Sequence, residues 1–108
     1  MKDLGSIMKQ AQAMQQRMAE AQEKIAALEV QGTSGGGMVS VTLRGSGELS
    51  RVNLDDSLMA PGEAEVVSDL VVAAHADAKR KLDAAQADIM RDAAGPLAGM
   101  NIPGMPKF

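Results

Sequence analysis

Apolar side chains near the start of the chain recur at alternating steps of three and four residues. The stripe consists of Leu4, Ile7, Ala11, Met14, Met18, Ala21, Ile25 and Leu28. Residues 2–28 contain no Pro and are rich in strong helix formers, so the pattern predicts a helix about 40 Å long. The strict heptad repeat is typical of a helix–helix seam within one chain or between two, and an amphipathic helix lying on a sheet is the alternative. The residues expected in the core or dimer seam are Ile7, Met14, Met18, Ile25 and Leu28.

Residues 29–59 change to an alternation of period two that is interrupted by Gly-rich turns. In the segment 38–43, Val39, Val41 and Leu43 share one face. In 49–54 the alternation places two sets on opposite faces: Ser50, Val52 and Leu54, and Leu49, Arg51 and Asn53. Such alternation predicts a β-meander. The expected antiparallel strands lie near residues 28–33, 37–44 and 48–54, joined by turns at Ser34-Gly35-Gly36 and Gly45-Ser46-Gly47.

A second long helix is predicted after Pro61, because Pro suits the first turn of a helix. Glu63 and Glu65 suit the positive end of the helix dipole. Apolar side chains then recur at a spacing near 3.6 residues, and Gly95-Pro96 ends the pattern. We therefore expect a helix over about residues 61–93.

These elements predict an α+β fold of order α-β-β-β-α, with a small antiparallel three-stranded sheet and two long helices. The folded domain should span residues 1–94, and residues 95–108 should form a flexible Gly/Pro/Met-rich C-terminal tail. Much of the apolar content is Ala and Met, so the core of a monomer would be thin. A three-stranded sheet also has two edges to protect. We therefore expect a homodimer.

The composition excludes several kinds of site. The chain has no Cys, Trp or Tyr, so it has no disulfide scaffold, no Cys nucleophile and no aromatic platform for stacking bases. No apolar run is long enough to span a membrane, and the N-terminus does not have the pattern of a signal peptide. We expect a cytoplasmic protein with no membrane partner.

Three features could suggest catalysis, and each has a simpler structural interpretation. The Gly-rich run over 32–37 lacks the Lys and Ser/Thr of a phosphate loop and is better interpreted as a hairpin turn. Asp55-Asp56 is more typical of a turn and cap than of paired catalytic carboxylates. His75 lacks a second His or Glu at helical spacing, so it is interpreted as a partly exposed structural residue. We expect no enzyme activity, no cofactor, no metal and no small-molecule substrate.

Basic residues are clustered locally although the formal net charge is −3. The expected first helix carries Lys2, Lys9, Arg17 and Lys24 on a flank away from the heptad seam, and the last helix carries Lys79, Arg80 and Lys81 in succession. Such groups could contact phosphates. The alternative is a solvated helix surface with ion pairs such as Lys79–Asp83 and Asp88–Arg91.

Four segments carry a family resemblance in combination. They are 8–18 (MKQAQAMQQRM), 28–39 (LEVQGTSGGGMV), 55–58 (DDSL) and 69–78 (DLVVAAHADA). Together with the short Met/Pro/Gly tail ending in Phe108, they resemble the YbaB/EbfC family of bacterial nucleoid-associated proteins. The resemblance covers nearly the whole chain.

The resemblance implies a homodimer whose long helices project as a tweezer-like pair. It also implies binding to DNA in the nucleoid with weak sequence preference, a role in gene regulation and no enzyme activity. The implied DNA-binding residues lie on the two helices: Lys9, Arg17, Lys24, Lys79, Arg80 and Lys81. We expect mainly phosphate contacts to duplex DNA. The competing hypothesis is a protein-interaction module that docks a partner protein through its heptad helix.

Overall fold

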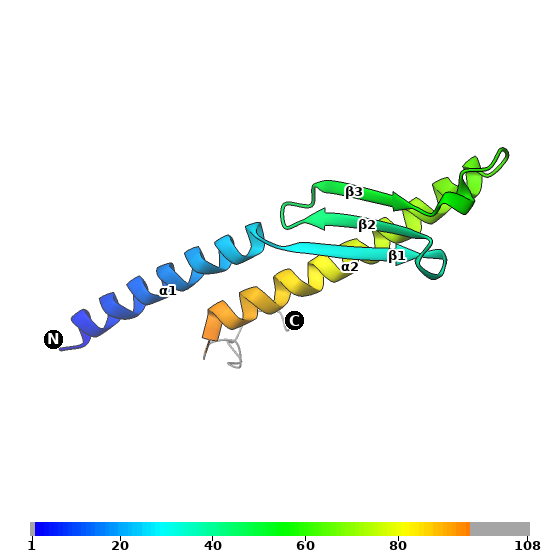
Figure 1. The fold of residues 1–108 in the computed structure, drawn as a ribbon. Helices are drawn as coiled ribbons and strands as arrows, with labels where there is room; N and C mark the ends of the chain where they lie inside the picture. Colours follow the sequence, from blue (N-terminus) through cyan, green and yellow to red (C-terminus); the bar gives the residue numbers. More distant parts are fainter. Residues whose placement is uncertain (1, 96–108) are drawn as a thin grey trace.

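The structure is a computed structural model that describes residues 2–95 of the chain (Figure 1). Its elements are α1 (Lys2–Ala26), β1 (Glu29–Ser34), β2 (Val39–Arg44), β3 (Leu49–Leu54) and α2 (Ala64–Ala94), with 3-10 turns at Gly35–Gly37 and Asp56–Leu58. The α+β class and the order α-β-β-β-α are confirmed. The tail expected over residues 95–108 lies outside the described residues, except for Gly95.

The sheet is antiparallel with strand order β1-β2-β3, and α2 lies along one of its faces (Figure 1). α1 leads away from the sheet and packs with its C-terminal part against the end of α2. The result is an elongated subunit with extents of 76 × 26 × 16 Å. The N-terminal part of α1 projects beyond the end of α2, and residues 4–13 of this part are all exposed.

The core lies between β2 and α2. The predicted alternation places three fully buried side chains of β2 on this side: Val39, Val41 and Leu43. Ala74, Ala78 and Leu82 recur at helical spacing on α2 and pack against them, together with Leu58 from the turn after β3. The core is small because two of these three helix positions are Ala.

The closest approach of α2 to the sheet occurs at Gly32 of β1. A Cβ at this position would collide with the backbone of Ala74 and Ala78. Gly32 therefore does not mark a turn within the Gly-rich segment. It lies inside a strand, where the absence of a side chain lets β1 rest directly on the backbone of α2 at Ala74 and Ala78.

Gly45 has a similar role at the end of α1. Its backbone N–H donates a hydrogen bond of 2.9 Å to the carbonyl oxygen of Leu28, and a Cβ here would collide with the carbonyl of Ile25. The hairpin between β2 and β3 therefore fits directly against the segment in which α1 ends and β1 begins.

The predicted start of the second helix was wrong by three residues. α2 begins at Ala64 with Glu63 as its N-cap, and Pro61 belongs to the preceding turn. The reason is Gly62, which adopts a left-handed conformation with φ of 87°. This conformation separates Pro61 from the helix, whose φ values must be negative.

The predicted alternation in the third strand is confirmed over residues 51–54 but was wrong for Leu49 and Ser50. Leu43 pairs with Leu49 and Thr42 pairs with Arg51, so Ser50 is an extra residue at a β-bulge. The bulge lets Ser50 and Arg51 line the same polar face of the sheet, whereas Val52 is paired with the buried Val41. A strict period of two cannot detect such an inserted residue.

Replacing Gly32 by Ala should destabilise the fold, because the added methyl group would meet the backbone of α2. Overpacking of this kind costs about 1–3 kcal/mol. Urea unfolding followed by circular dichroism measures the loss. Gly5→Ala is the matched control: a Cβ at Gly5 meets nothing within 4 Å, and Ala should stabilise α1 by roughly 0.5–1 kcal/mol. Equal stability of Gly32→Ala and the wild type would contradict the close contact.

Candidate nucleic-acid interface

The predicted basic residues of α1 fall in two places. Lys9 lies on the exposed N-terminal part of the helix. Arg17 and Lys24 line a hollow between α1 and the end of α2, together with Glu20 and Asp92. The two cations of this hollow are therefore balanced by two carboxylates, and it is not a strongly positive site.

The predicted basic residues of α2 are exposed but form ion pairs along their own helix. Lys79 Nζ lies 2.8 Å from Asp83 Oδ1, Arg80 Nη2 lies 3.3 Å from Asp77 Oδ1, and Lys81 Nζ lies 3.0 Å from Asp77 Oδ2. The predicted Lys79–Asp83 pair is thus confirmed. The Lys79–Asp83 pair is exposed on both sides, and such a pair contributes only about 0–1 kcal/mol. An incoming phosphate can therefore compete with Asp83 at little cost, whereas Asp77 is only 24% exposed.

A second predicted pair, Asp88–Arg91, is also confirmed at 3.0 Å. Ion pairs thus recur along the C-terminal half of α2. Arg17 and Lys24 adjoin residues 89–93 of this helix, two or more turns beyond residues 79–81. The six predicted DNA-binding residues therefore lie along the two helices and do not form a single patch.

Asp77 and Lys81 also form hydrogen bonds with the free edge of β1. The backbone N–H of Thr33 donates a hydrogen bond of 3.0 Å to Asp77 Oδ2, and Lys81 Nζ donates one of 3.1 Å to the carbonyl oxygen of Gln31. The pair thus occupies one donor and one acceptor that a further strand would use. The hydrogen bond from Thr33, followed by that from Lys81, holds the pKa of Asp77 below its ordinary value.

Two features that could have suggested catalysis, Asp55 and His75, lie in ordinary structural positions. Asp55 caps the 3-10 turn after β3, accepting a hydrogen bond of 3.1 Å from the backbone N–H of Ser57 and another from the Ser57 hydroxyl. These bonds, the hydroxyl first, lower the pKa of Asp55. The predicted turn and cap are confirmed. His75 is exposed on α2.

Within residues 2–95, no three His, Asp or Glu side chains lie close enough together to hold a metal ion. Neither helix in this part of the chain is long and apolar enough to cross a membrane.

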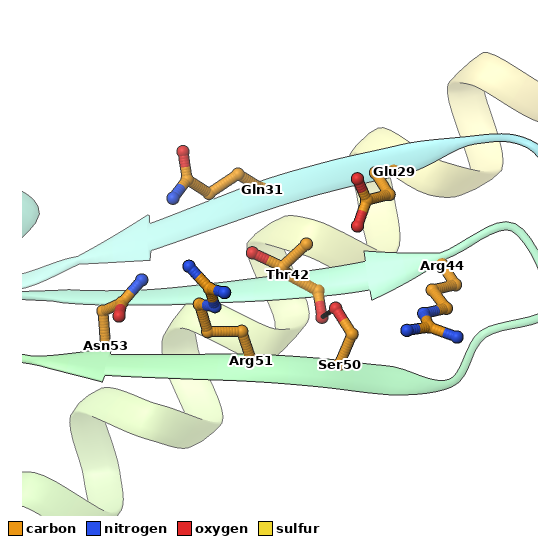
Figure 2. Close-up of a pocket in the computed structure, with 7 residues that line it drawn as sticks. All are labelled: Glu29, Gln31, Thr42, Arg44, Ser50, Arg51 and Asn53. Atoms are coloured by element: carbon orange, nitrogen blue, oxygen red, sulfur yellow. Dashed lines mark hydrogen bonds between the residues drawn. The ribbon is translucent and has the colours of Figure 1, made fainter.

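The sequence interpretation missed a polar surface on the open face of the sheet. Figure 2 shows seven side chains on the face opposite α2: Glu29, Gln31, Thr42, Arg44, Ser50, Arg51 and Asn53. They line a hollow of about 330 Å³. Arg44 and Arg51 come from different strands, and the bulge at Ser50 sets the register that brings them to one surface. The alternation of polar residues in each strand could have indicated this face, but it does not show which residues of neighbouring strands pair.

The sequence model of the YbaB/EbfC DNA-binding family matches residues 1–97. The chain belongs to this family. It is 73% identical to a nucleoid-associated protein of Phenylobacterium zucineum, over all of this chain and 99% of the relative. It is 68% identical to a nucleoid-associated protein of Caulobacter sp., over 97% of this chain and 98% of the relative.

A solved structure has a similar fold. The crystal structure of an uncharacterized protein from Helicobacter pylori matches with a TM-score of 0.65 and 26% sequence identity. The match covers 88% of this chain and 97% of the other. The α-β-β-β-α arrangement is therefore similar in a much more distant sequence.

Asp77 predicts a pH dependence of stability. Because its pKa is lowered in the folded chain, Asp77 contributes stability above about pH 4, and this contribution is lost as the pH falls through the folded pKa. Asp77→Asn should lower the urea midpoint at pH 6 and make the midpoint less sensitive to pH between about 5 and 2.

Asp83→Asn is the control, since Asp83 forms only an exposed pair with Lys79. Its urea midpoint at pH 6 should stay close to that of the wild type. A midpoint for Asp77→Asn that matches the wild type at every pH would contradict a role for this carboxylate at the edge of β1.

Proposed function

We propose that this protein is a nucleoid-associated protein that binds duplex DNA as a homodimer, mainly through phosphate contacts and with weak sequence preference. In this way it contributes to nucleoid organisation and gene regulation. Membership of the YbaB/EbfC DNA-binding family supports the proposal, and two close relatives are named nucleoid-associated proteins.

The observation that carries the DNA-binding proposal is the row of exposed cations over residues 79–81. The side chains of Lys79, Arg80 and Lys81 are all more than half exposed. Lys79 and Arg80 are each held only by a carboxylate of the same helix, whereas Lys81 also donates to the carbonyl oxygen of Gln31. Consecutive helix residues point about 100° apart, so Lys79 and Arg80 could reach neighbouring phosphates of one duplex, whereas Lys81 reaches the edge of β1. Lys9, Arg17 and Lys24 on α1 are the further proposed contacts.

The acidic background limits the expected affinity. The formal net charge is −3, and the carboxylates that pair with the cations of α2 would be repelled by phosphates. Binding should therefore be modest and should weaken steeply as salt is added, because counterions released from DNA supply most of its driving force.

A second copy of the chain would bury surface that the single subunit leaves open. α2 covers β1 and β2, whereas β3 exposes Leu49, Val52 and Leu54 on the side that faces the core. Since Asp77 and Lys81 occupy the edge of β1, the edge of β3 is the better candidate for pairing between subunits. We infer that the dimer forms along β3.

One observation favours the competing role as a protein-interaction module. The projecting part of α1 exposes Leu4, Ile7 and Met8, and Ile7 is 58% exposed although it belongs to the predicted seam. By contrast, Met14, Met18, Ile25 and Leu28 are half-buried. A partner helix could cover the exposed apolar stripe.

Removing the cations of α2 should weaken binding to all duplex sequences about equally. In mobility-shift titrations, Lys79→Ala/Arg80→Ala should bind less tightly, and the slope of log affinity against log salt should fall by about 0.9 for each lost phosphate contact. Lys81 is left intact because it also binds the edge of β1.

Arg91→Ala is the matched control, since Arg91 is equally an exposed cation paired along α2 but is not a proposed contact. It should change affinity by less than about twofold, within the usual range for an uninvolved surface charge. Absence of any shift by the wild-type protein at low salt would favour the protein-interaction module and contradict the DNA-binding proposal.

The dimer should depend on the apolar side of β3. Light scattering of the wild type should give twice the chain mass of 11.2 kDa, whereas Val52→Glu should give one chain mass, because a carboxylate would be buried without a partner at the interface. Val52 is 38% exposed in the single subunit, so the subunit itself should still fold.

Val72→Glu is the control for an added carboxylate. Val72 is 67% exposed on α2, and this variant should remain dimeric. Circular dichroism confirms that both variants are folded. A Val52→Glu protein that is folded and still dimeric would show that the interface lies elsewhere.

A further inference from the structure

The open face of the sheet carries its polar side chains in rows across the strands. The register places Gln31, Thr42 and Arg51 side by side, one from each strand. A second row consists of Thr33, Ser40 and Asn53. Every side chain in both rows can form hydrogen bonds, and Figure 2 shows the labelled members of both rows on the face away from α2.

Arg51 differs from the cations of α2 in its surroundings. Within residues 2–95, each of the three cations at 79–81 forms an ion pair, whereas Arg51 forms none. The carboxylate on this face, Glu29, lies on the far strand near the end of the sheet where Arg44 lies (Figure 2). The guanidinium of Arg51 is therefore available to a ligand.

The hydrogen bonds within this surface leave most of its groups available. Asn53 Nδ2 donates to Ser40 Oγ over 3.3 Å, and Ser50 Oγ donates to the carbonyl oxygen of Thr42 over 3.3 Å. The side-chain amide oxygen of Asn53 and the guanidinium of Arg51 remain able to bind a ligand. The hollow of about 330 Å³ in front of them is polar and open.

The residue types match the edges of DNA bases. An Arg fork pairs with the O6 and N7 acceptors of guanine, Asn and Gln pair with the N6 and N7 of adenine, and Ser and Thr can serve either base. Thr42, Arg51 and Asn53 lie on the neighbouring strands β2 and β3, which are about 4.8 Å apart, and the major groove admits a two-stranded ribbon of this kind. The major groove of B-DNA is about 12 Å wide.

We propose that the face formed by Gln31, Thr42, Arg51 and Asn53 enters the major groove of duplex DNA, with Arg51 bound to a guanine edge. This inference rests on the proposed DNA binding and adds a second surface to the helical phosphate contacts. Few side chains take part, so the sequence preference that they confer is weak.

The proposed dimer leaves this face open. Val52 and Leu54, which we infer to lie at the interface, are paired with the buried Val41 and Val39 and thus belong to the opposite side of the sheet. Pairing along β3 would place the polar faces of two subunits on the same side of one continuous sheet.

Methylation of guanine N7 by dimethyl sulfate tests the proposal, because N7 lies in the major groove. A mixed-sequence duplex is treated at low salt with each protein at a concentration that shifts all of the DNA. The wild type should protect a subset of guanines, and Arg51→Thr should lose this protection while still shifting the DNA. Thr keeps a high strand propensity, and circular dichroism checks the fold.

Two control variants separate this surface from the helices. Lys79→Ala/Arg80→Ala should need more protein to shift the DNA but should protect the same guanines once it is bound. Arg91→Ala should resemble the wild type in both measurements. Loss of protection in Arg51→Thr alone is the result that supports the proposal.

Other outcomes overturn it in distinguishable ways. A wild-type protein that shifts the DNA without protecting any guanine N7 contradicts the major-groove contact but leaves the phosphate contacts standing. Equal protection by Arg51→Thr and the wild type contradicts the role of Arg51. A wild-type protein that fails to shift DNA at low salt contradicts the proposed function and this inference together.

Discussion

The contact between α2 and β1 determines where the other surfaces of the subunit lie. Gly32 has no side chain, and the residues of α2 that face it are Ala74 and Ala78, so backbone packs on backbone. This close approach brings Asp77 and Lys81 within hydrogen-bond distance of the edge of β1. The same helix turn that packs the core thus also completes one edge of the sheet, and its exposed side carries Lys79 and Arg80.

Placing α2 over β1 and β2 has two consequences for the rest of the sheet. β3 keeps exposed apolar side chains on the core side, which provides a physical reason for a second subunit. The opposite face has no covering helix in the described chain and gathers polar side chains from all three strands (Figure 2). A single small helix–sheet core therefore leaves one surface suited to association and another suited to a polar ligand.

Charge is distributed so that cations are available without making the chain basic. The cations of α2 lie beside carboxylates three or four residues away, which weakly neutralise them in the free protein. Arg51 on the sheet has no such partner among the described residues. Affinity for DNA from the helices and discrimination among bases from the sheet would thus rest on different elements.

Local pattern was sufficient for much of this fold. The heptad stripe predicted α1, the alternation around Val41 predicted the central strand, and the spacing of Lys79 and Asp83 predicted their ion pair. Such features depend on residues within a few positions of each other, whose relative placement follows from helix and strand geometry. The family motifs also lie in short segments.

Only the tertiary structure decided the features that join distant segments. The role of Gly32 depends on a helix more than forty residues later, the bulge at Ser50 depends on pairing with β2, and the row of Gln31, Thr42 and Arg51 depends on the register of three strands. The start of α2 depended on the backbone conformation of Gly62. Periodicity in the sequence determines which face of an element is apolar, whereas close packing between elements determines which faces are covered and which remain available.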